Sequence, residues 1–536
     1  MTVREIIHHY AVKAMPHHNC GSNLNLLRDS LLSVGKVRTV SLPGLFAAMS
    51  RGEDITFRAL RPHQRPAWHM FCVQLAALAL WHGGEQELPT EEGRWRDLLR
   101  GLTPDFPDDE PWCLVVADRG KPAFLQPPDP GGLKWTEVPT PDALDMLITA
   151  RNHDLKQQVM HQATPEDWLF ALVSLQTMEG YGGRGNHGIA RMNGGSSSRV
   201  VLGLAPQPRR QDIQPDPVSW WRRDVHVLLR SRAEGVEEGP CTPGGKALLW
   251  LEDWPEGAQL APQDLDPWFI EVCRRVRLKT DGTPLRAERS PSKAARTNAK
   301  QFNGVLGDSW APVERTSGKT LTLGENGRFD YKRLNRLLLS GDWDLPLCAR
   351  PQTDDGDMLL VAEAIARGNS KTGGFASRII PIPSGMVNRF SAPEMQQLAK
   401  DQIKEIEQFG KALRNALALL AANGDYESLD KEHYTFARPA HAAFDARADA
   451  LFFPALWERV EAHENSDAAL KEAQQRFNNA LARIAIEEFE AALPTIPGSS
   501  LFRPRAEVRA RDALFRQLRH AGFELHGSAR EAAHAE

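Results

Sequence analysis

The sequence lacks a long hydrophobic run. Hydrophobic residues make up 41% of its 536 residues, but the longest strongly apolar stretch, Met70–Trp81, is far short of a membrane span. Crossing a bilayer as a helix takes about 20 residues. The N-terminus also has no sustained apolar run of the kind that secretory signals contain. We therefore expect no membrane partner.

Paired cysteines and a strong charge of one sign are missing as well. The six cysteines are scattered and never form a C-x-x-C pair, which disfavours a zinc ribbon, a thioredoxin-type site and a disulfide scaffold. This usage predicts a reducing, cytoplasmic location. The 65 Lys and Arg residues against 69 Asp and Glu leave a net charge of −4, so the chain is not a polybasic nucleic-acid coat.

Catalytic motifs are absent too. The sequence has no H-E-x-x-H, no Walker lysine loop and no nucleophile elbow. A literal G-x-G-x-x-G occurs at Gly183, Gly185 and Gly188, but a helix pattern precedes it and no acidic residue follows at the ribose position. We therefore expect no cofactor, no metal and no enzyme activity.

One alternative remains, a metal-dependent nuclease or phosphohydrolase that uses His153 and Asp154. Such chemistry needs further His and Asp residues at matched positions, and none is evident; a polar loop at a helix end also explains the dipeptide. Residues 1–21 contain four histidines and Cys20, yet no partner cluster with finger spacing follows. We expect this leader to be disordered or a start-site extension.

The length predicts two or three folded regions. Up to about residue 390 the chain reads as mixed α/β with long loops. Apolar spacing and caps predict helices at 66–81, 142–150, 165–178, 331–339 and 358–366, and strands at 268–278 and 379–382.

After residue 391 alanine rises, glycine nearly vanishes and long helical patterns appear at about 392–423, 439–463, 465–493 and 505–521. The fold class predicted is therefore α+β, a large mixed α/β N-terminal domain followed by a C-terminal four-helix bundle. The predicted domains are a leader (1–21), an α/β domain (22–390) and the bundle (391–536).

Positive charge gathers in one segment, residues 272–300. This segment contains nine basic residues and only two acidic ones, Asp281 and Glu288, so its net charge is +7. This clustering indicates a phosphate-binding surface, to which Arg289 and Arg296 would contribute. The alternative is a solvated strand edge, where basic residues discourage aggregation.

Residues 180–188 form a glycine-rich segment. Several glycines remove Cβ atoms, so this backbone could approach a nucleic-acid backbone or groove closely. Arg184, Arg191 and Arg199 add positive charge nearby, and we expect Arg184 to contact phosphate. The alternative is a flexible connector.

The predicted elements, the glycine-rich segment and the basic segment, in this order along the chain, resemble the large subunit of the type I-E CRISPR Cascade complex, the CasA family. Asn25–Asp29 followed by Val37–Leu42 resembles that family's first strands, and Leu75–Leu80 is similar to its first long helix. Pro122–Gln126 resembles its "P-F-x-Q" segment. The glycine loop and the late change to a helical bundle are similar in place, so the resemblance spans roughly residues 23–520.

The resemblance implies a non-catalytic subunit of an RNA-guided surveillance complex. Its implied partners are the other Cascade subunits, the CRISPR guide RNA, double-stranded target DNA and a helicase-nuclease. It would recognise the protospacer-adjacent motif in the minor groove, promote strand separation and R-loop formation, and help recruit the helicase-nuclease.

The family's contact elements are similar to particular residues of this chain. The resemblance implies a DNA-binding glycine loop at Gly182, Gly183 and Gly185, and a minor-groove lysine at Lys293 or else Lys279. It also implies a wedge loop, which inserts beside the first opened base pair of the DNA. This loop would lie at Asn369, Ser370 and Lys371, where the family has glutamine. A loop that meets guide RNA and neighbouring subunits would include Asn152, His153 and Lys156.

Overall fold

A computed structural model describes residues 24–145, 147, 160, 162–208, 213–236, 238–280, 284–368 and 371–524. Several predicted sites lie outside the described residues: the leader 1–21, Asn152, His153, Asp154 and Lys156, and Asn369 and Ser370 of the wedge. Their roles stay predictions.

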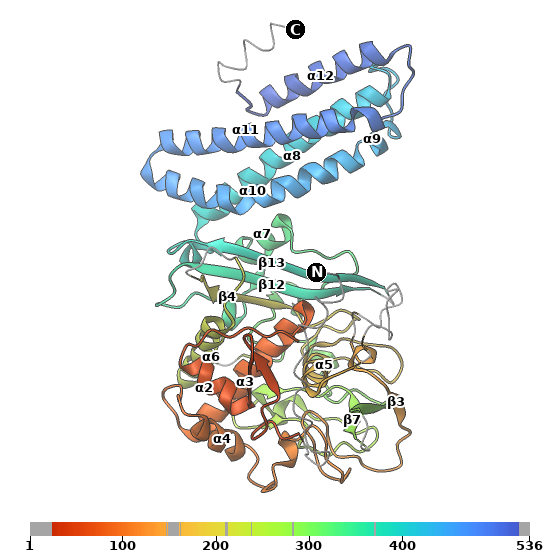
Figure 1. Ribbon diagram of the computed structural model, residues 1–536. Helices are drawn as coiled ribbons and strands as arrows, with labels where there is room; N and C mark the ends of the chain where they lie inside the picture. The colour runs from red at the N-terminus through yellow and green to blue at the C-terminus, as the bar shows by residue number, and fades with distance from the viewer. Residues whose placement is uncertain are drawn as a thin grey trace, which may run out of the picture.

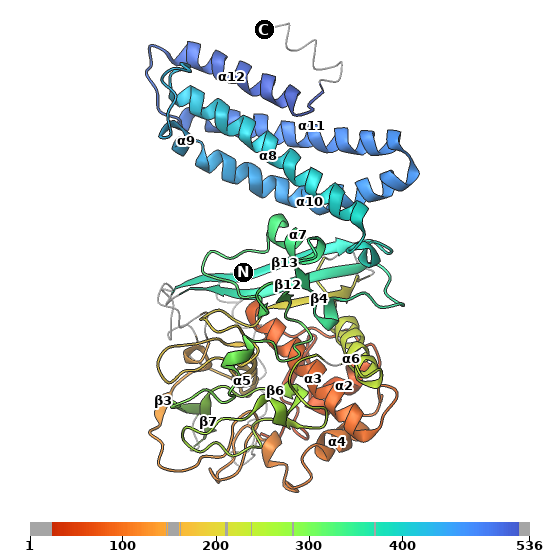
Figure 2. The same ribbon diagram turned by 180° about the vertical axis from the view of Figure 1, so that it is seen from behind.

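The molecule is built in three tiers (Figure 1). A mixed α/β region forms the lower tier, a three-stranded sheet the middle tier, and a bundle of long helices the upper tier. The reverse view shows the same order (Figure 2). The predicted fold class, a mixed α/β part followed by a helical bundle, is therefore confirmed.

Helix α3 lies at the centre of the lower tier. Its first turn contains Pro66, which suits a position whose N–H has no helical partner, and it ends at Gly84 with φ +68°. Its neighbour α5 begins at a cap in which Thr164 and Asp167 bond to each other's backbone N–H. Both helices confirm their predictions. The lower-tier helices are α2 (Leu42–Ser50), α3 (Arg65–Gly83), α4 (Glu92–Gly101), α5 (Pro165–Met178) and α6 (Pro217–Ala233).

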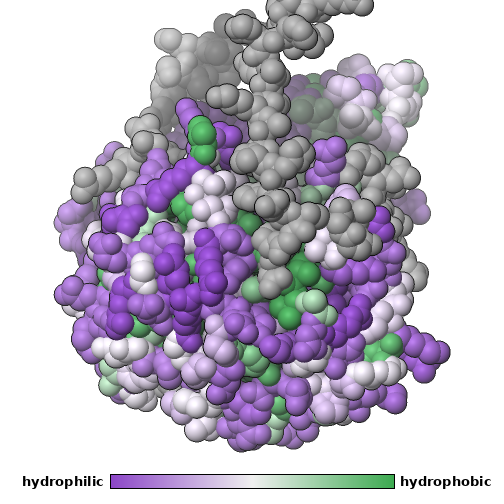
Figure 3. Space-filling model, turned by 60° about the horizontal axis from the view of Figure 1, so that its bottom comes forward, coloured by the Kyte–Doolittle hydropathy of each residue, from purple (hydrophilic) through white to green (hydrophobic). Residues whose placement is uncertain are grey.

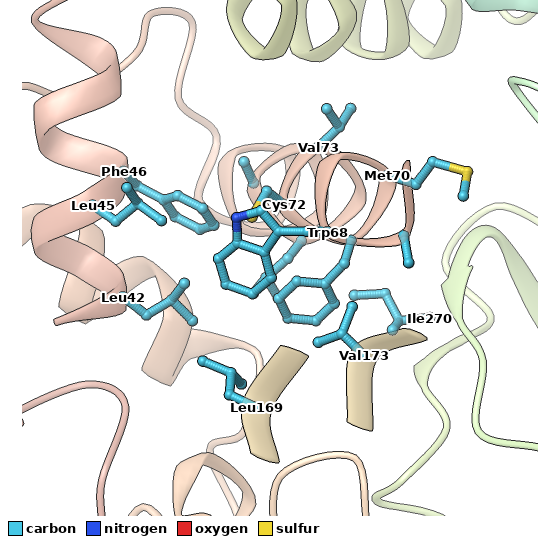
Figure 4. Packing of buried hydrophobic residues seen from close by; sticks show 14 of the residues in the cluster. Leu42, Leu45, Phe46, Trp68, Met70, Cys72, Val73, Leu169, Val173 and Ile270 are labelled. Atoms are coloured by element: carbon cyan, nitrogen blue, oxygen red, sulfur yellow. The ribbon is translucent and has the colours of Figure 1, made fainter. Parts of the chain in front are cut away.

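The first hydrophobic core surrounds α3. Figure 4 shows the Trp68 ring lying between Phe46 of α2 and Leu169 and Val173 of α5. Trp68 also meets Phe170 edge to face, with ring centroids 5.0 Å apart. Because α3 is apolar on all sides, it is buried by helices and strands all round.

Small sheets surround this core. Strands β3 (Thr136–Val138), β8 and β7 form one sheet, in which β7 (Arg275–Lys279) and β8 (Arg286–Ser290) are antiparallel. The strand predicted over 268–278 is in fact two, because the chain leaves β6 and turns through 271–274 into β7. The other pairings are β1 (Leu32–Val34) with β2 (Arg38–Val40), β5 (Lys246–Leu248) with β6 (Leu265–Ile270), and β9 (Val313–Glu314) with β10 (Lys319–Thr320) and β11 (Trp343–Asp344).

The middle tier is an antiparallel sheet in the order β13-β12-β4: β4 (Val201–Pro206), β12 (Met358–Arg367) and β13 (Thr372–Ile382). The helix predicted over 358–366 was wrong, because these residues form β12. Leu359 and Val361 face the first core, whereas Leu360 and Ala362 face the second. A strand buried on both faces is apolar throughout, and periodicity alone cannot distinguish it from a buried helix.

The start of the helix predicted over 142–150 does not form the predicted α-helix in the structure. The chain makes a short 3-10 turn there, Pro141–Ala143, and is irregular at Asp145. Residues 146 and 148–150 lie outside the described part.

The upper tier confirms the four long helices predicted from the sequence. They are α8 (Pro393–Ala421), α10 (Arg438–Asn465), α11 (Asp467–Ala492) and α12 (Arg503–His520), with the short α9 (His433–Phe436) between α8 and α10. Ser466 separates α10 from α11 and caps the latter by accepting the Ala469 N–H at 3.1 Å.

The second hydrophobic core joins the sheet to the bundle through α7 (Tyr331–Leu339). Arg378 of β13 pairs with Asp449 of α10 at 2.9 Å, and the Trp457 indole donates to the Pro381 carbonyl at 3.0 Å. This core crosses the domain boundary predicted at residue 391, and that boundary stays a prediction.

No helix in the described residues is long and apolar enough to span a membrane. The lower surface, seen from below, is mostly hydrophilic, with apolar residues in several small areas, one of them near its centre (Figure 3).

Candidate nucleic-acid interface

The glycine loop, Gly180–Gly188, follows α5 directly and folds back on itself. Asn186 N donates to the Gly183 carbonyl and Gly182 N donates to the Asn186 carbonyl, both at 2.9 Å. Gly183 has φ +111° and an added Cβ would have no neighbour within 4 Å, so this residue needs glycine's backbone freedom rather than space. The neighbours of Gly183 at this tip, Gly182 and Arg184, are exposed.

A second segment touches this loop. Residues Ser290–Lys293, here called the lysine turn, follow β8, and Ser292 N donates to the Gly185 carbonyl at 3.0 Å. A Cβ on Gly185, where φ is +78°, would lie 2.6 Å from the Pro291 Cβ. Only glycine permits this approach. The structure thus places the glycine loop and Lys293 on one surface, although about a hundred residues separate them in sequence.

The C-terminal end of β12, close to where the chain passes into β13, is bonded to the same region. Ile365 N donates to Ser198 Oγ at 2.7 Å, and Ser198 N donates to the Ile365 carbonyl at 3.3 Å. Arg199 N in turn donates to the Met178 carbonyl at the end of α5. The hairpin tip, with the exposed Lys371, therefore lies on the same side of the molecule as the loops after α5 (Figure 1).

Much of the basic segment is interior, which corrects the charge-based prediction. Arg296 is 2% exposed and donates to the carbonyls of Asp253 at 2.9 Å and Glu252 at 2.8 Å. It is therefore not available to phosphate in this structure. Burial lowers the pKa of Arg296 to about 10, so it stays protonated at neutral pH.

Other arginines of this region are buried for the same reason. Arg277 donates to the Lys121 carbonyl at 3.1 Å, and Arg275 stacks on Trp254 at 4.3 Å. Arg191 lies 3.5 Å from the Phe269 ring centroid, and Arg199 is paired with Asp308 at 2.6 Å. Counting charges cannot separate an arginine that satisfies buried carbonyls from one that faces solvent.

Arg184, Arg289 and Lys293 are among the basic residues near the glycine loop that are exposed. Lys279, the other candidate for the groove lysine, is half-buried and bound to Glu288 at 2.7 Å. Lys293 is exposed, and its backbone N–H donates to Glu256 at 2.7 Å, which fixes the turn while leaving the ammonium outside. This geometry favours Lys293 over Lys279.

Two arginines beneath the loop were not singled out from the sequence. Arg274 Nη2 donates to the Gly180 carbonyl at 2.7 Å, and Arg367 lies beside it at the hairpin end. With Arg289 they line a cavity of about 90 Å³, and Glu179 is the one carboxylate among the described residues that line it. Burial lowers the pKa of Arg367, only partly offset by Glu179. No sequence signal could have placed Arg367 here, because β12 was predicted as a helix.

Two buried glutamines fix the geometry. Gln176 Oε1 accepts the Arg274 N–H at 2.8 Å, which ties the end of α5 to the strand that supports Arg274. Gln126, the glutamine of the "P-F-x-Q" segment, accepts the Leu278 N–H at 2.6 Å and donates to the Leu114 carbonyl at 2.9 Å. The segment's glutamine thus completes the edge of β7, a structural role.

The described residues contain no group of three or more His, Cys, Asp and Glu side chains that could hold a metal ion. His153 and Asp154 are not among them.

No protein-family model matches the chain, and no curated protein does. Solved structures do. CasA (Cse1) of Thermus thermophilus superposes with a TM-score of 0.61 at 16% identity, over 93% of this chain and 99% of that one. The chain has the CasA fold. Cse1 of Acidimicrobium ferrooxidans gives a TM-score of 0.61 at 16% identity, with 93% and 98% covered. Cse1 of Thermobifida fusca gives 0.56 at 12%, with the same coverage. The resemblance to CasA drawn from short motifs is confirmed as a likeness of fold.

Proposed function

We propose that this chain is the non-catalytic large subunit of a type I-E Cascade complex in the cytoplasm. In this role it recognises a short motif in duplex DNA through the minor groove and helps to part the strands. The supporting observation is the direct contact between the glycine loop and the lysine turn, because it brings the exposed Gly182 and the exposed side chain of Lys293 onto one surface. The CasA fold over 93% of the chain agrees with this role.

Such a surface suits the minor groove. That groove presents few distinguishing groups, chiefly A·T against G·C. A lysine and a backbone loop can reject wrong bases there while accepting several right ones. Arg184 and Arg289 flank the surface and would neutralise phosphates, which makes affinity salt-dependent.

The hairpin tip supplies the wedge in this proposal. Ile365, near the C-terminal end of β12, donates to Ser198 Oγ, which keeps this end of the strand beside the loops that follow α5. Unstacking one base step costs a few kcal/mol. Base pairing of a guide RNA with one strand offsets most of the cost of opening, an argument made for another RNA-guided effector. Contacts between this chain and the opened base step would then supply the rest of the free energy of opening, so no ATP is needed.

The proposed partners follow from the same role. They are the other Cascade subunits and the guide RNA, contacted through Asn152, His153 and Lys156, the target duplex at the glycine loop, and a helicase-nuclease.

The decisive experiment measures motif-dependent DNA binding by the assembled complex with Gly183→Asp. This change adds a carboxylate at the exposed tip, where an added Cβ meets no other atom, so binding should be abolished. Gly385→Asp is the matched control. Gly385 also has positive φ (+85°) and open space, but follows β13 at the end opposite the hairpin tip. Equal binding by the two variants would refute the proposal.

The alternative, a metal-dependent nuclease, is tested by incubating the purified protein with Mn²⁺ or Mg²⁺ and single- or double-stranded DNA. Cleavage that His153→Ala abolishes would establish it.

A further inference from the structure

A groove that is distinct from the cavity lined by Arg274 and Arg367 also borders the glycine loop. Its volume is about 750 Å³, and it has no lining residue in common with that cavity. One wall is the glycine loop with residues 192–195, and the other is Ala295 and residues 297–300 with Gln259 and Asn303. We call it the amide groove.

The lining is polar without being acidic. Among the described residues that line it there is no Asp or Glu, and Lys300 is exposed at its edge. The side chains of Asn193, Asn298 and Asn303 make no hydrogen bond within the part of the chain that the structure describes. Free amides both donate and accept, as the edges of unpaired bases require, and a wall without carboxylates tolerates phosphate.

An exposed aromatic side chain completes the lining. Tyr181 is 43% exposed, although large apolar rings are usually buried. Its ring centroid lies 6.4 Å from that of His187, and both belong to the glycine loop. Flat rings in a groove free of negative charge are the usual platforms on which unpaired bases stack. The bases of an intact duplex are stacked within it and cannot reach such a platform.

We propose that the amide groove binds single-stranded DNA, with one unpaired base stacked on Tyr181 and its edge bonded to the asparagine amides. This inference rests on the proposed function, since it gives a place to one strand released beside the glycine loop. Because every base has a flat face that can stack, the groove should bind single-stranded DNA of any sequence.

The test uses the purified full chain and a labelled 20-mer of thymidine, with binding followed by fluorescence anisotropy. Tyr181→Ala should weaken binding about 5- to 150-fold, the range for losing one stacked base. Tyr181→Phe keeps the ring and should stay within about twofold of the parent chain. Tyr426→Ala, which removes a more exposed tyrosine (56%) from the loop after α8, should change nothing.

A second arm does not depend on the ring. Asn298→Asp places a carboxylate in the groove and should weaken binding, most strongly at low salt. Unchanged binding by both Tyr181→Ala and Asn298→Asp would overturn the inference. Tighter, Tyr181-dependent binding of a 20-mer of uridine would also overturn it, in favour of RNA.

The outcome is separable from that of the proposed function. If Gly183→Asp abolishes motif-dependent duplex binding but Tyr181→Ala leaves single-strand binding intact, only the amide groove proposal fails. If Tyr181→Ala weakens single-strand binding while Gly183→Asp leaves duplex binding intact, only the duplex proposal fails.

Discussion

Replacing Gly185 with alanine would separate the two segments on which the proposed interface depends. The new Cβ would lie 2.6 Å from the Pro291 Cβ, whereas carbon atoms pack at about 3.5–4.0 Å. The lysine turn must therefore move by about 1 Å, enough to weaken the bond from Ser292 N to the Gly185 carbonyl.

The magnitude has two parts. A left-handed backbone costs a non-glycine residue about 1–2 kcal/mol, and a lost hydrogen bond costs about 0.5–1.5 kcal/mol. Local opening of the contact should become easier by about 2 kcal/mol, which is about 30-fold. The Ser292 amide should exchange its hydrogen faster by about that factor.

Hydrogen–deuterium exchange of peptides that cover Ser292, read by mass spectrometry, is the assay. The control is Gly385→Ala, where φ is +85° and an added Cβ meets nothing within 4 Å. It should leave exchange at Ser292 unchanged. We also expect Gly185→Ala to weaken motif-dependent DNA binding by about tenfold, equivalent to 1.4 kcal/mol. Parent-like exchange at Ser292 in Gly185→Ala would refute the reasoning.

Three further predictions concern single side chains. Lys293→Ala should weaken motif-dependent binding by about 1–3 kcal/mol, and it should lower the slope of log binding constant against log salt concentration by about one. If a DNA titration shows this loss for Lys279→Ala instead, Lys279 and not Lys293 is the groove lysine. Arg296→Ala should remove the hydrogen bonds that this buried guanidinium donates to the carbonyls of Glu252 and Asp253, at about 0.5–1.5 kcal/mol each, and lower the unfolding temperature. Arg184→Ala should weaken DNA binding only, so equal thermal stability of the two variants would contradict this. Burial raises the pKa of Glu271 from 4.5 to about 7. Because the folded state then binds the extra proton, stability should fall by about 3 kcal/mol as pH rises from 4.5 to 7 and level off above it. Glu271→Gln keeps an oxygen for the Ala190 N–H and should lose that part of the pH dependence in thermal melts, so a parent-like pH profile would count against the assignment.

Much of the fold was predictable because local signals agreed with tertiary structure. The Thr164–Asp167 cap and the apolar face of 66–81 gave two helices, and the alanine-rich C-terminal pattern gave four more. The prediction over 358–366 failed because helix-forming residues such as Met, Leu, Ala and Glu fill a strand that is buried on both faces. Tertiary burial overrode their intrinsic preference.

The candidate site was predictable in outline only. The glycine loop and the Ser-Pro-Ser-Lys turn were visible as composition, and the structure brings them into contact at Gly185 and Ser292. Arg296 shows the limit of charge counting, since its guanidinium is buried and donates to main-chain carbonyls. Arg367 and Tyr181 have no sequence signal of their own, because their significance depends on what lies beside them in space.

The central claim is that the glycine loop and the lysine turn contact the same few base pairs. A photo-cross-linking side chain placed at Arg184 in one preparation and at Lys293 in another, in the assembled complex on target duplex, tests it most directly. The account predicts that both positions cross-link to the same base pairs, immediately beside the sequence that pairs with the guide. Cross-links at separate regions of the duplex, or from neither position, would contradict it.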